Sequence, residues 1–199
     1  MKSKKKKTAL VLGGGGSRGA YEIGAWQAFS ELGVRFQAVY GTSAGAINAA
    51  LFAQGDLEKA SSLWENINIK QLMNAENEDF TIDSMISRKR DVIPFLIENA
   101  KHLQVDTAPM EAFLNAHLDE GAVRASGIDL GVMTVRVPQL SPAPMRLRDM
   151  EPGTLSNWVI ASASCFPVFP MRKIDGDRYV DGGYFDNMPI DMAIADGAD

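Results

Sequence analysis

The chain has 199 residues, of which 46% are hydrophobic and 23% are charged, the balance of an ordinary globular domain with a full core. Its formal net charge of −5 argues against nucleic acid as a partner, because domains that bind nucleic acid are usually basic. The single cysteine, Cys165, rules out an intrachain disulfide. This cysteine usage fits a cytoplasmic location.

The N-terminus is a short basic tail. Residues 1–7 contain five lysines, and we place the domain itself at 8–199. A signal peptide is not predicted, because the apolar run 9–12 ends at once in four glycines. No stretch of 18 apolar residues occurs, so no transmembrane helix is predicted. The simplest interpretation of the tail is a solvated terminus, and the alternative is weak peripheral contact with an anionic membrane surface.

Strands and helices alternate along the first part of the chain. Residues 8–12 form a continuous apolar strand, and a glycine loop at 13–19 leads into a helix predicted over 20–32. A second strand at 36–40 is followed by a helix predicted over 44–54. This βαβα order is typical of an α/β fold with a parallel sheet.

The middle of the chain has a helical pattern. Apolar residues at helical spacing predict a helix over 56–68, with Asp56 as its N-cap. Two more helices are predicted over 91–104 and 107–118. Because the region 70–120 has no strand signal, we expect it to be a helical insertion that borders the site.

Strand patterns return in the last third of the chain. A strand is predicted over 128–137, and a helix over 155–163. The strands 171–174 and 178–180 flank an Asp-Gly-Asp turn and are predicted to form a hairpin.

Residues 41–45 read Gly-Thr-Ser-Ala-Gly and match G-x-S-x-G, the nucleophile elbow. A predicted strand precedes the motif and a predicted helix follows it. Gly41 and Gly45 remove Cβ atoms that would clash in so tight a turn. Ser43 then presents its hydroxyl beside a helix N-terminus, which favours developing negative charge. The motif predicts Ser43 as a nucleophile, and the alternative is a Gly/Ser-rich turn without chemistry.

The first glycine loop has two interpretations. It matches G-x-G-x-x-G through Gly14, Gly15, Gly16, Ser17, Arg18 and Gly19. A dinucleotide site would also require an acidic residue at the end of the second strand, and 37–40 contains none. We favour an oxyanion hole, in which successive backbone N–H groups converge on an oxygen that becomes negative. Arg18 either supports this loop, meets an anionic head group or is simply exposed.

The serine needs a base. Both histidines, His102 and His117, lie in the polar helical middle, whereas α/β-hydrolases place the triad histidine last in the chain. Asp181 instead ends an apolar strand before Gly182 and Gly183, at a strand tip, where open α/β sheets bind ligands. A carboxylate can act as a general base, although Asp-Gly is also a common turn. Asp181 is therefore the candidate base.

Taken in order, the motifs at 14–19, 41–45 and 181–183 resemble those of the patatin-like phospholipase family. Smaller segments agree with this resemblance at 106–110, 161–170 and 187–189. The similarity covers the chain from Thr8 to Asp199. It implies a three-layer α/β/α fold with a mostly parallel central sheet and a helical insertion.

The same resemblance implies a Ser–Asp catalytic dyad that hydrolyses lipid acyl esters without a metal or other cofactor. Ser43 matches the nucleophile, Asp181 the base, and Gly14, Gly15 and Gly16 the oxyanion loop. The expected partner is a lipid or acyl-ester substrate of phospholipase A or lysophospholipase type. Family members usually continue into another strand, so we expect this chain to be a fragment of a longer protein or a trimmed one.

Two other functions remain open at this point. The chain could be a lipid- or acyl-binding module that kept the fold without the chemistry. It could also bind a nucleotide through the loop at 14–19. Labelling by a serine-reactive fluorophosphonate distinguishes the three, because only a serine hydrolase would be labelled, at Ser43.

Overall fold

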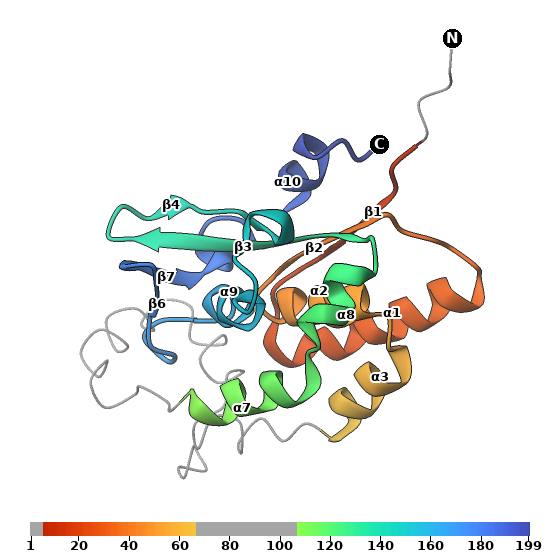
Figure 1. Ribbon diagram of the computed structural model, residues 1–199, viewed down its shortest axis with the longest axis horizontal. Coiled ribbons are helices and arrows are strands. Elements are labelled where there is room, and N and C mark those ends of the chain that lie inside the picture. The colour runs from red at the N-terminus through yellow and green to blue at the C-terminus, as the bar shows by residue number, and fades with distance from the viewer. Residues whose placement is uncertain (1–5, 67–106) are drawn as a thin grey trace, which may run out of the picture.

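The computed structural model describes residues 6–66 and 107–199 (Figure 1). The first range contains β1 (Ala9–Leu12), the 3-10 turn η1 (Gly16–Arg18), α1 (Gly19–Glu31), β2 (Ala38–Thr42), α2 (Ala44–Gln54) and α3 (Leu57–Asn66). The second range contains α7 (Ala108–His117), α8 (Glu120–Ala125), β3 (Asp129–Val137), β4 (Ser141–Pro142), β5 (Met145–Arg146), η2 (Leu147–Asp149), α9 (Leu155–Ser162), β6 (Arg172–Ile174), β7 (Asp177–Asp181), η3 (Gly182–Tyr184) and α10 (Ile190–Ala195).

The sheet is covered on both faces. Successive residues of a strand point to opposite faces, and in β2 both sets are buried. Val39 packs into the large core beneath the sheet, whereas Ala38 and Tyr40 pack against Met192 and Ala193 of α10. Figure 1 shows α10 above the sheet and α1, α2 and α9 below it. The predicted three-layer α/β/α fold is therefore confirmed.

The helix α2 lies at the centre of the lower layer. Most of its residues are buried, including Leu51 and Phe52, and it contacts β2, β3, α1 and α9. The ring of Phe52 packs against Trp26 at 4.9 Å and Phe36 at 5.8 Å between centroids. Burying one such side chain contributes about 1.5–3 kcal/mol. The start of α2, which carries the elbow, is thus held by a rigid part of the core.

The long strand β3 organises the sheet. The strands β1 and β2 and the first half of β3 are parallel, as predicted, but β7 is antiparallel to β3, so the sheet is mixed. Gly131 and Val132 of β3 pair with β2 and with β5, while Val135 and Arg136 pair with β4 and with β7. The strands β4 and β5 pair with β3 in one continuous antiparallel register, so both lie along the same edge of β3. It follows that β2 and β7 share the opposite edge, end to end.

Most of the predicted elements are present. The strand and helix predictions of the first 66 residues are confirmed, and Asp56 caps α3 by accepting a hydrogen bond from the Lys59 N–H at 2.9 Å. The helix predicted over 107–118 is α7, and the predicted hairpin is β6–β7. The short elements α8, β4, β5 and α10 were not predicted. The helix predicted over 91–104, and most of the predicted insertion at 70–120, lie outside the described residues.

Candidate active site

The elbow has the geometry that its motif predicts. Ser43 joins β2 to α2 with φ 57° and ψ −124°, a backbone conformation that residues other than glycine rarely adopt. A Cβ on Gly41 would lie 2.1 Å from the carbonyl oxygen of Gly45, and a Cβ on Gly45 would lie 2.5 Å from that of Leu12. Neither position can hold a side chain, so both glycines are needed for the turn that exposes Ser43.

A buried serine holds the elbow against the sheet. The Ser43 N–H donates to Ser162 Oγ at 3.0 Å, and the Ser162 hydroxyl donates to the Met133 carbonyl oxygen at 2.7 Å. Ser162 is the last residue of α9 and is completely buried. Three elements, α9, β3 and the β2–α2 turn, are therefore linked through one hydroxyl.

The nucleophile and the candidate base meet beside β3. The strand β2 ends at Thr42, which pairs with Met133, and β7 ends at Asp181, which pairs with the next residue, Thr134. The Ser43 side chain lies close enough to the Asp181 carboxylate to lower the pKa of that group. Asp181 is the last residue of its strand, as expected, and β7 is antiparallel to β3. Asp181 reaches Ser43 because β7 runs toward β2 along the same edge of β3.

The Asp181 carboxylate is almost fully buried, with 6% of the residue exposed. Burial raises its pKa above the ordinary value. The Gly183 N–H, which donates to the carboxylate at 2.7 Å, and the nearby Ser43 side chain lower this pKa only in part. A Cβ on Gly182 would lie 2.3 Å from the Met133 carbonyl oxygen, so the chain passes close over β3 at this point. A carboxylate with a raised pKa is a stronger base than an exposed aspartate.

The first glycine loop lies next to the serine. A Cβ built on Gly14 would lie 3.0 Å from Ser43 Cβ. The Gly14 N–H donates to the Asn187 carbonyl oxygen at 3.2 Å and is therefore occupied. Within residues 6–66 and 107–199, the N–H groups of Gly15 and Gly16 contact no acceptor. Two donors of the loop are thus without a partner among the described residues, and a ligand oxygen could accept from both.

A partly buried network anchors the start of the loop. Glu22 of α1 accepts hydrogen bonds from the Gly13 N–H and from the Asn48 side chain, both at 2.8 Å. Burial raises the Glu22 pKa, and these two contacts oppose the shift. Asn48 also donates to the Gly19 carbonyl oxygen at 2.9 Å and accepts from Trp64 Nε1 at 2.7 Å. The loop is consequently connected to α1, α2 and α3.

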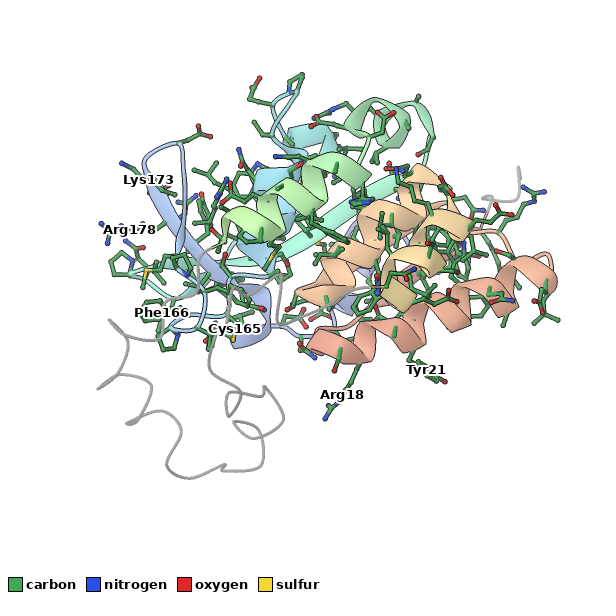
Figure 2. The ribbon with its side chains drawn as sticks, turned by 90° about the horizontal axis from the view of Figure 1, so that it is seen from below. Arg18, Tyr21, Cys165, Phe166, Lys173 and Arg178 are labelled. Atoms are coloured by element: carbon green, nitrogen blue, oxygen red, sulfur yellow. The ribbon has the colours of Figure 1, made fainter. Side chains whose placement is uncertain are left out.

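A pocket of about 610 Å³ opens over the glycine loop. Its walls are formed by Gly13, Gly14, Gly15, Ser17, Arg18, Tyr21, Glu22, Asn187 and Met188. Figure 2 shows Arg18 and Tyr21 pointing away from the body of the molecule at the rim of this pocket. The lining of the pocket carries one exposed cation, Arg18, and one exposed ring, Tyr21, which is 83% exposed.

The sequence model of patatin-like phospholipases matches residues 10–194. The chain belongs to the patatin-like phospholipase family. Patatin-like phospholipase domain-containing protein 7 of Rattus norvegicus is 30% identical over 192 residues, which cover 96% of this chain and 13% of that protein. Lysophospholipase NTE1 of Cryptococcus neoformans is 28% identical over 182 residues, which cover 91% of this chain and 10% of that protein.

A solved structure agrees with this chain on the fold. VipD from Legionella pneumophila superposes with a TM-score of 0.63 at 19% identity, covering 94% of this chain and 48% of VipD. The patatin-like chain thus spans only 13% and 10% of the two curated relatives, and about half of VipD. No helix in the described ranges is long and apolar enough to cross a membrane.

The histidine that the structure describes does not join this site. His117 ends α7, where its Nδ1 lies 2.7 Å from the Phe113 carbonyl oxygen and its ring packs on Phe113. His102 lies outside the described residues. In the part of the patatin-like domain that the structure describes, no group of three or more His, Cys, Asp or Glu side chains could hold a metal ion.

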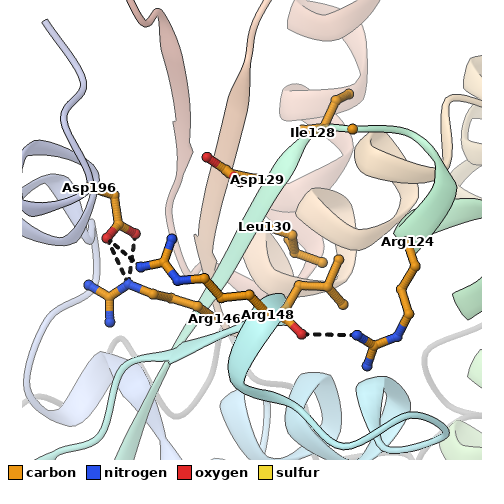
Figure 3. Close-up of a pocket in the computed structure, with 9 residues that line it drawn as sticks. Arg124, Ile128, Asp129, Leu130, Arg146, Arg148 and Asp196 are labelled. Atoms are coloured by element: carbon orange, nitrogen blue, oxygen red, sulfur yellow. Dashed lines mark hydrogen bonds and ion pairs between the residues drawn. The ribbon is translucent and has the colours of Figure 1, made fainter.

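A second pocket, of about 260 Å³, lies beside the first residues of β3, Asp129 and Leu130 (Figure 3). It is lined by arginines, but these are already paired within the protein. Arg146 and Arg148 bind the Asp196 carboxylate at 2.8 and 3.1 Å, and Arg124 donates to the Leu147 carbonyl oxygen at 3.1 Å. The charged residues around this pocket therefore form a structural ion-pair cluster, which joins the end of α10 to the sheet.

The structure adds three residues to which the sequence assigned no role: Ser162, Glu22 and Asn187. Ser162 and Asn187 lie in two of the segments that supported the resemblance, 161–170 and 187–189. Glu22 gave no such signal, because an acidic residue in the first turn of a helix is ordinary.

Proposed function

We propose that this patatin-like domain is a serine acyl hydrolase that cleaves carboxylic ester bonds of lipids. Ser43 is the nucleophile, and Asp181 is its general base. The observation that supports this assignment is that the Ser43 side chain lies close enough to the buried Asp181 carboxylate to lower its pKa, at the point where β2 and β7 end on adjacent residues of β3. A base must come within hydrogen-bond reach of the proton that it removes, and this placement brings the two side chains together.

In the acylation step, Asp181 accepts the hydroxyl proton while Ser43 Oγ forms a bond to the ester carbonyl carbon. The carbonyl oxygen becomes an oxyanion in the tetrahedral intermediate. When the intermediate collapses, the bond to the leaving alcohol breaks and Asp181 returns the proton to that alcohol. The acyl chain remains on Ser43.

The oxyanion is assigned to the N–H groups of Gly15 and Gly16, which contact no acceptor in the described part of the chain. The Gly14 N–H is already bound to Asn187, so Gly14 shapes the loop while its two neighbours donate. The N-terminus of α2, which begins one residue after Ser43, adds a favourable partial positive charge. Losing one such donor typically costs about 10²–10³ in kcat.

In the second half of the reaction, Asp181 removes a proton from water, which attacks the acyl carbon. The ester bond to Ser43 breaks, a fatty acid leaves, and the proton returns to Ser43. The lipid class is assigned by similarity, because one relative is named a lysophospholipase and another a patatin-like phospholipase domain protein. We therefore propose a phospholipase A or lysophospholipase-type substrate.

The test is labelling by a fluorophosphonate probe together with turnover of a soluble p-nitrophenyl ester and of a lysophospholipid. We expect Ser43→Ala to lose labelling and turnover while the circular dichroism spectrum is unchanged. Asp181→Asn should lower kcat by about 10²–10⁴. His117→Ala is the control and should keep wild-type turnover, because the His117 ring packs on Phe113 of its own helix and its Nδ1 lies 2.7 Å from the Phe113 carbonyl oxygen.

Two outcomes would contradict the proposal. Wild-type turnover by Ser43→Ala would show that Ser43 is not the nucleophile. An absence of labelling in the folded wild-type domain would favour an acyl-binding or nucleotide-binding module instead. Because Asp181 must be ionised, we also expect kcat to fall on the acid side with a midpoint above the ordinary aspartate value, in the direction that burial moves its pKa.

A further inference from the structure

The side chain of Asn187 lies between the two halves of the proposed machinery. A Cβ built on Gly14, in the glycine loop, would be 2.4 Å from Asn187 Oδ1. A Cβ built on Gly183, next to the base, would be 3.1 Å from the same oxygen and 3.1 Å from Asp181 Oδ1. The amide of Asn187 therefore fills the space between the glycine loop and the base.

Asn187 binds one residue of the loop, Gly14, at two points. Its Nδ2 donates to the Gly14 carbonyl oxygen at 3.0 Å, and its own carbonyl oxygen accepts the Gly14 N–H at 3.2 Å. Two hydrogen bonds to the same residue fix the rotation of that residue about the chain as well as its position. The Gly14 carbonyl belongs to the peptide unit that carries the Gly15 N–H, so Asn187 sets the direction of that donor.

The segment that carries Asn187 is tied to the nucleophile. The Thr42 hydroxyl, one residue before Ser43 and fully buried, donates to the Asp186 carbonyl oxygen at 3.0 Å. The Met188 N–H donates to Asp186 Oδ1, also at 3.0 Å. The position of Asn187 is therefore set relative to Ser43 itself.

We infer that Asn187 is a positioning residue, which holds the glycine loop so that the Gly15 and Gly16 N–H groups face the oxyanion formed at Ser43. The inference rests on the proposed acyl-hydrolase function. Asn187 does not contact the reacting atoms in this account. It acts by keeping the loop aligned with the nucleophile before substrate arrives, which is where preorganised donors gain their effect.

The test uses Asn187→Ala, which removes the Nδ2 donor, and Asn187→Asp, which keeps the shape but places an acceptor against the Gly14 carbonyl. Asn66→Ala is the matched control, because the Asn66 side chain also donates to a backbone carbonyl, Ser62 O at 2.7 Å, at the end of α3. We measure kcat and KM on a soluble p-nitrophenyl ester at a pH where Asp181 is ionised. Active sites are counted by fluorophosphonate labelling.

We expect both Asn187 variants to lose about ten- to a hundredfold in kcat per labelled site, with KM within about twofold of wild type. A trifluoromethyl ketone forms a tetrahedral adduct with an oxyanion, so its inhibition constant should rise by the factor by which kcat/KM falls. Asn66→Ala should change neither quantity. A role in folding alone would lower the melting temperature and leave kcat per site and the inhibition constant unchanged.

The outcomes separate the two proposals. Wild-type kcat and ketone affinity in either Asn187 variant, with Ser43→Ala inactive, would overturn the positioning role and leave the hydrolase assignment in place. Wild-type turnover in Ser43→Ala would overturn both. The isosteric Asn187→Asp variant supplies the decision if Asn187→Ala does not fold.

Discussion

The hydroxyl of Ser162 offers the sharpest test of how the elbow is held. Replacing Ser162 by alanine removes an acceptor from the Ser43 N–H and a donor from the Met133 carbonyl. Ser164, two residues later, is an almost equally buried serine, but its hydroxyl donates only to the Ile160 carbonyl oxygen, which also accepts the Ala163 N–H. The two serines therefore differ mainly in whether they support Ser43.

The expected magnitudes follow from these contacts. A shielded N–H left without a partner costs about 1–3 kcal/mol, and the loss of an ordinary hydrogen bond costs about 0.5–1.5 kcal/mol. We expect Ser162→Ala to lower the free energy of unfolding by about 1.5–4.5 kcal/mol, and Ser164→Ala by about 0.5–1.5 kcal/mol. A domain with an ordinary stability of about 5–15 kcal/mol still folds after either change.

The assay combines urea unfolding, followed by tryptophan fluorescence, with kcat on a soluble ester measured on folded protein. We expect Ser162→Ala to lose about tenfold or more in kcat, because a small displacement of a nucleophile costs much of the rate. Ser164→Ala should keep wild-type kcat. Equal stability and equal kcat in the two variants would refute the reasoning, since it would mean that the Ser43 N–H does not depend on Ser162.

Three further predictions concern stability and are read from urea unfolding. Burial raises the Asp181 pKa, so ionised Asp181 destabilises the fold as pH rises. Asp181→Asn should therefore be more stable than wild type near neutral pH and lose that advantage below about pH 3.9, and a destabilised variant would contradict this. Arg146, Tyr40 and Arg148 overcome the effect of burial and hold the Asp196 pKa below its usual range. Asp196→Asn should cost about 1.5–3 kcal/mol near neutral pH and less in acid, and an unchanged midpoint at neutral pH would count against the ion-pair cluster. A Cβ on the exposed helical residue Gly24 would meet nothing within 4 Å, so Gly24→Ala should stabilise by about 0.5–1 kcal/mol, whereas Gly41→Ala should fail to fold normally.

The sequence predicted the parts of the site better than their arrangement. Local patterns were sufficient for the elbow, because a G-x-S-x-G turn depends on residues adjacent in the chain. The direction of β7 depends on pairing with β3, 41 to 47 residues earlier at the paired positions, and no local pattern encodes it. The strand-end position of Asp181 could be predicted from its local pattern, but the route by which β7 brings it to Ser43 could not.

The partners of the glycine loop were also beyond sequence reasoning. A glycine run indicates free N–H groups, but which of them are free depends on residues far away in the chain. Asn187 occupies the Gly14 N–H, and Glu22 occupies that of Gly13. Only the folded arrangement separates the donors that build the loop from those that remain for a ligand.

The end-to-end contact of β2 and β7 along β3 has a consequence for how this domain tolerates changes in length. The end of β2 pairs with β3 at Met133, and the end of β7 pairs with β3 at the next residue, Thr134. These two adjacent pairing positions set the separation of Ser43 and Asp181, whatever the number of residues that lies between Ser43 and Asp181 in the chain. One residue inserted in β3 between Met133 and Thr134 would move the base by about 3.4 Å and turn alternate side chains to the other face of the sheet. An insertion at Gly176, in the turn of the β6–β7 hairpin, would leave the pairing at Met133 and Thr134 unchanged. Homologous domains should therefore differ in their connections and keep the middle of β3 constant in length.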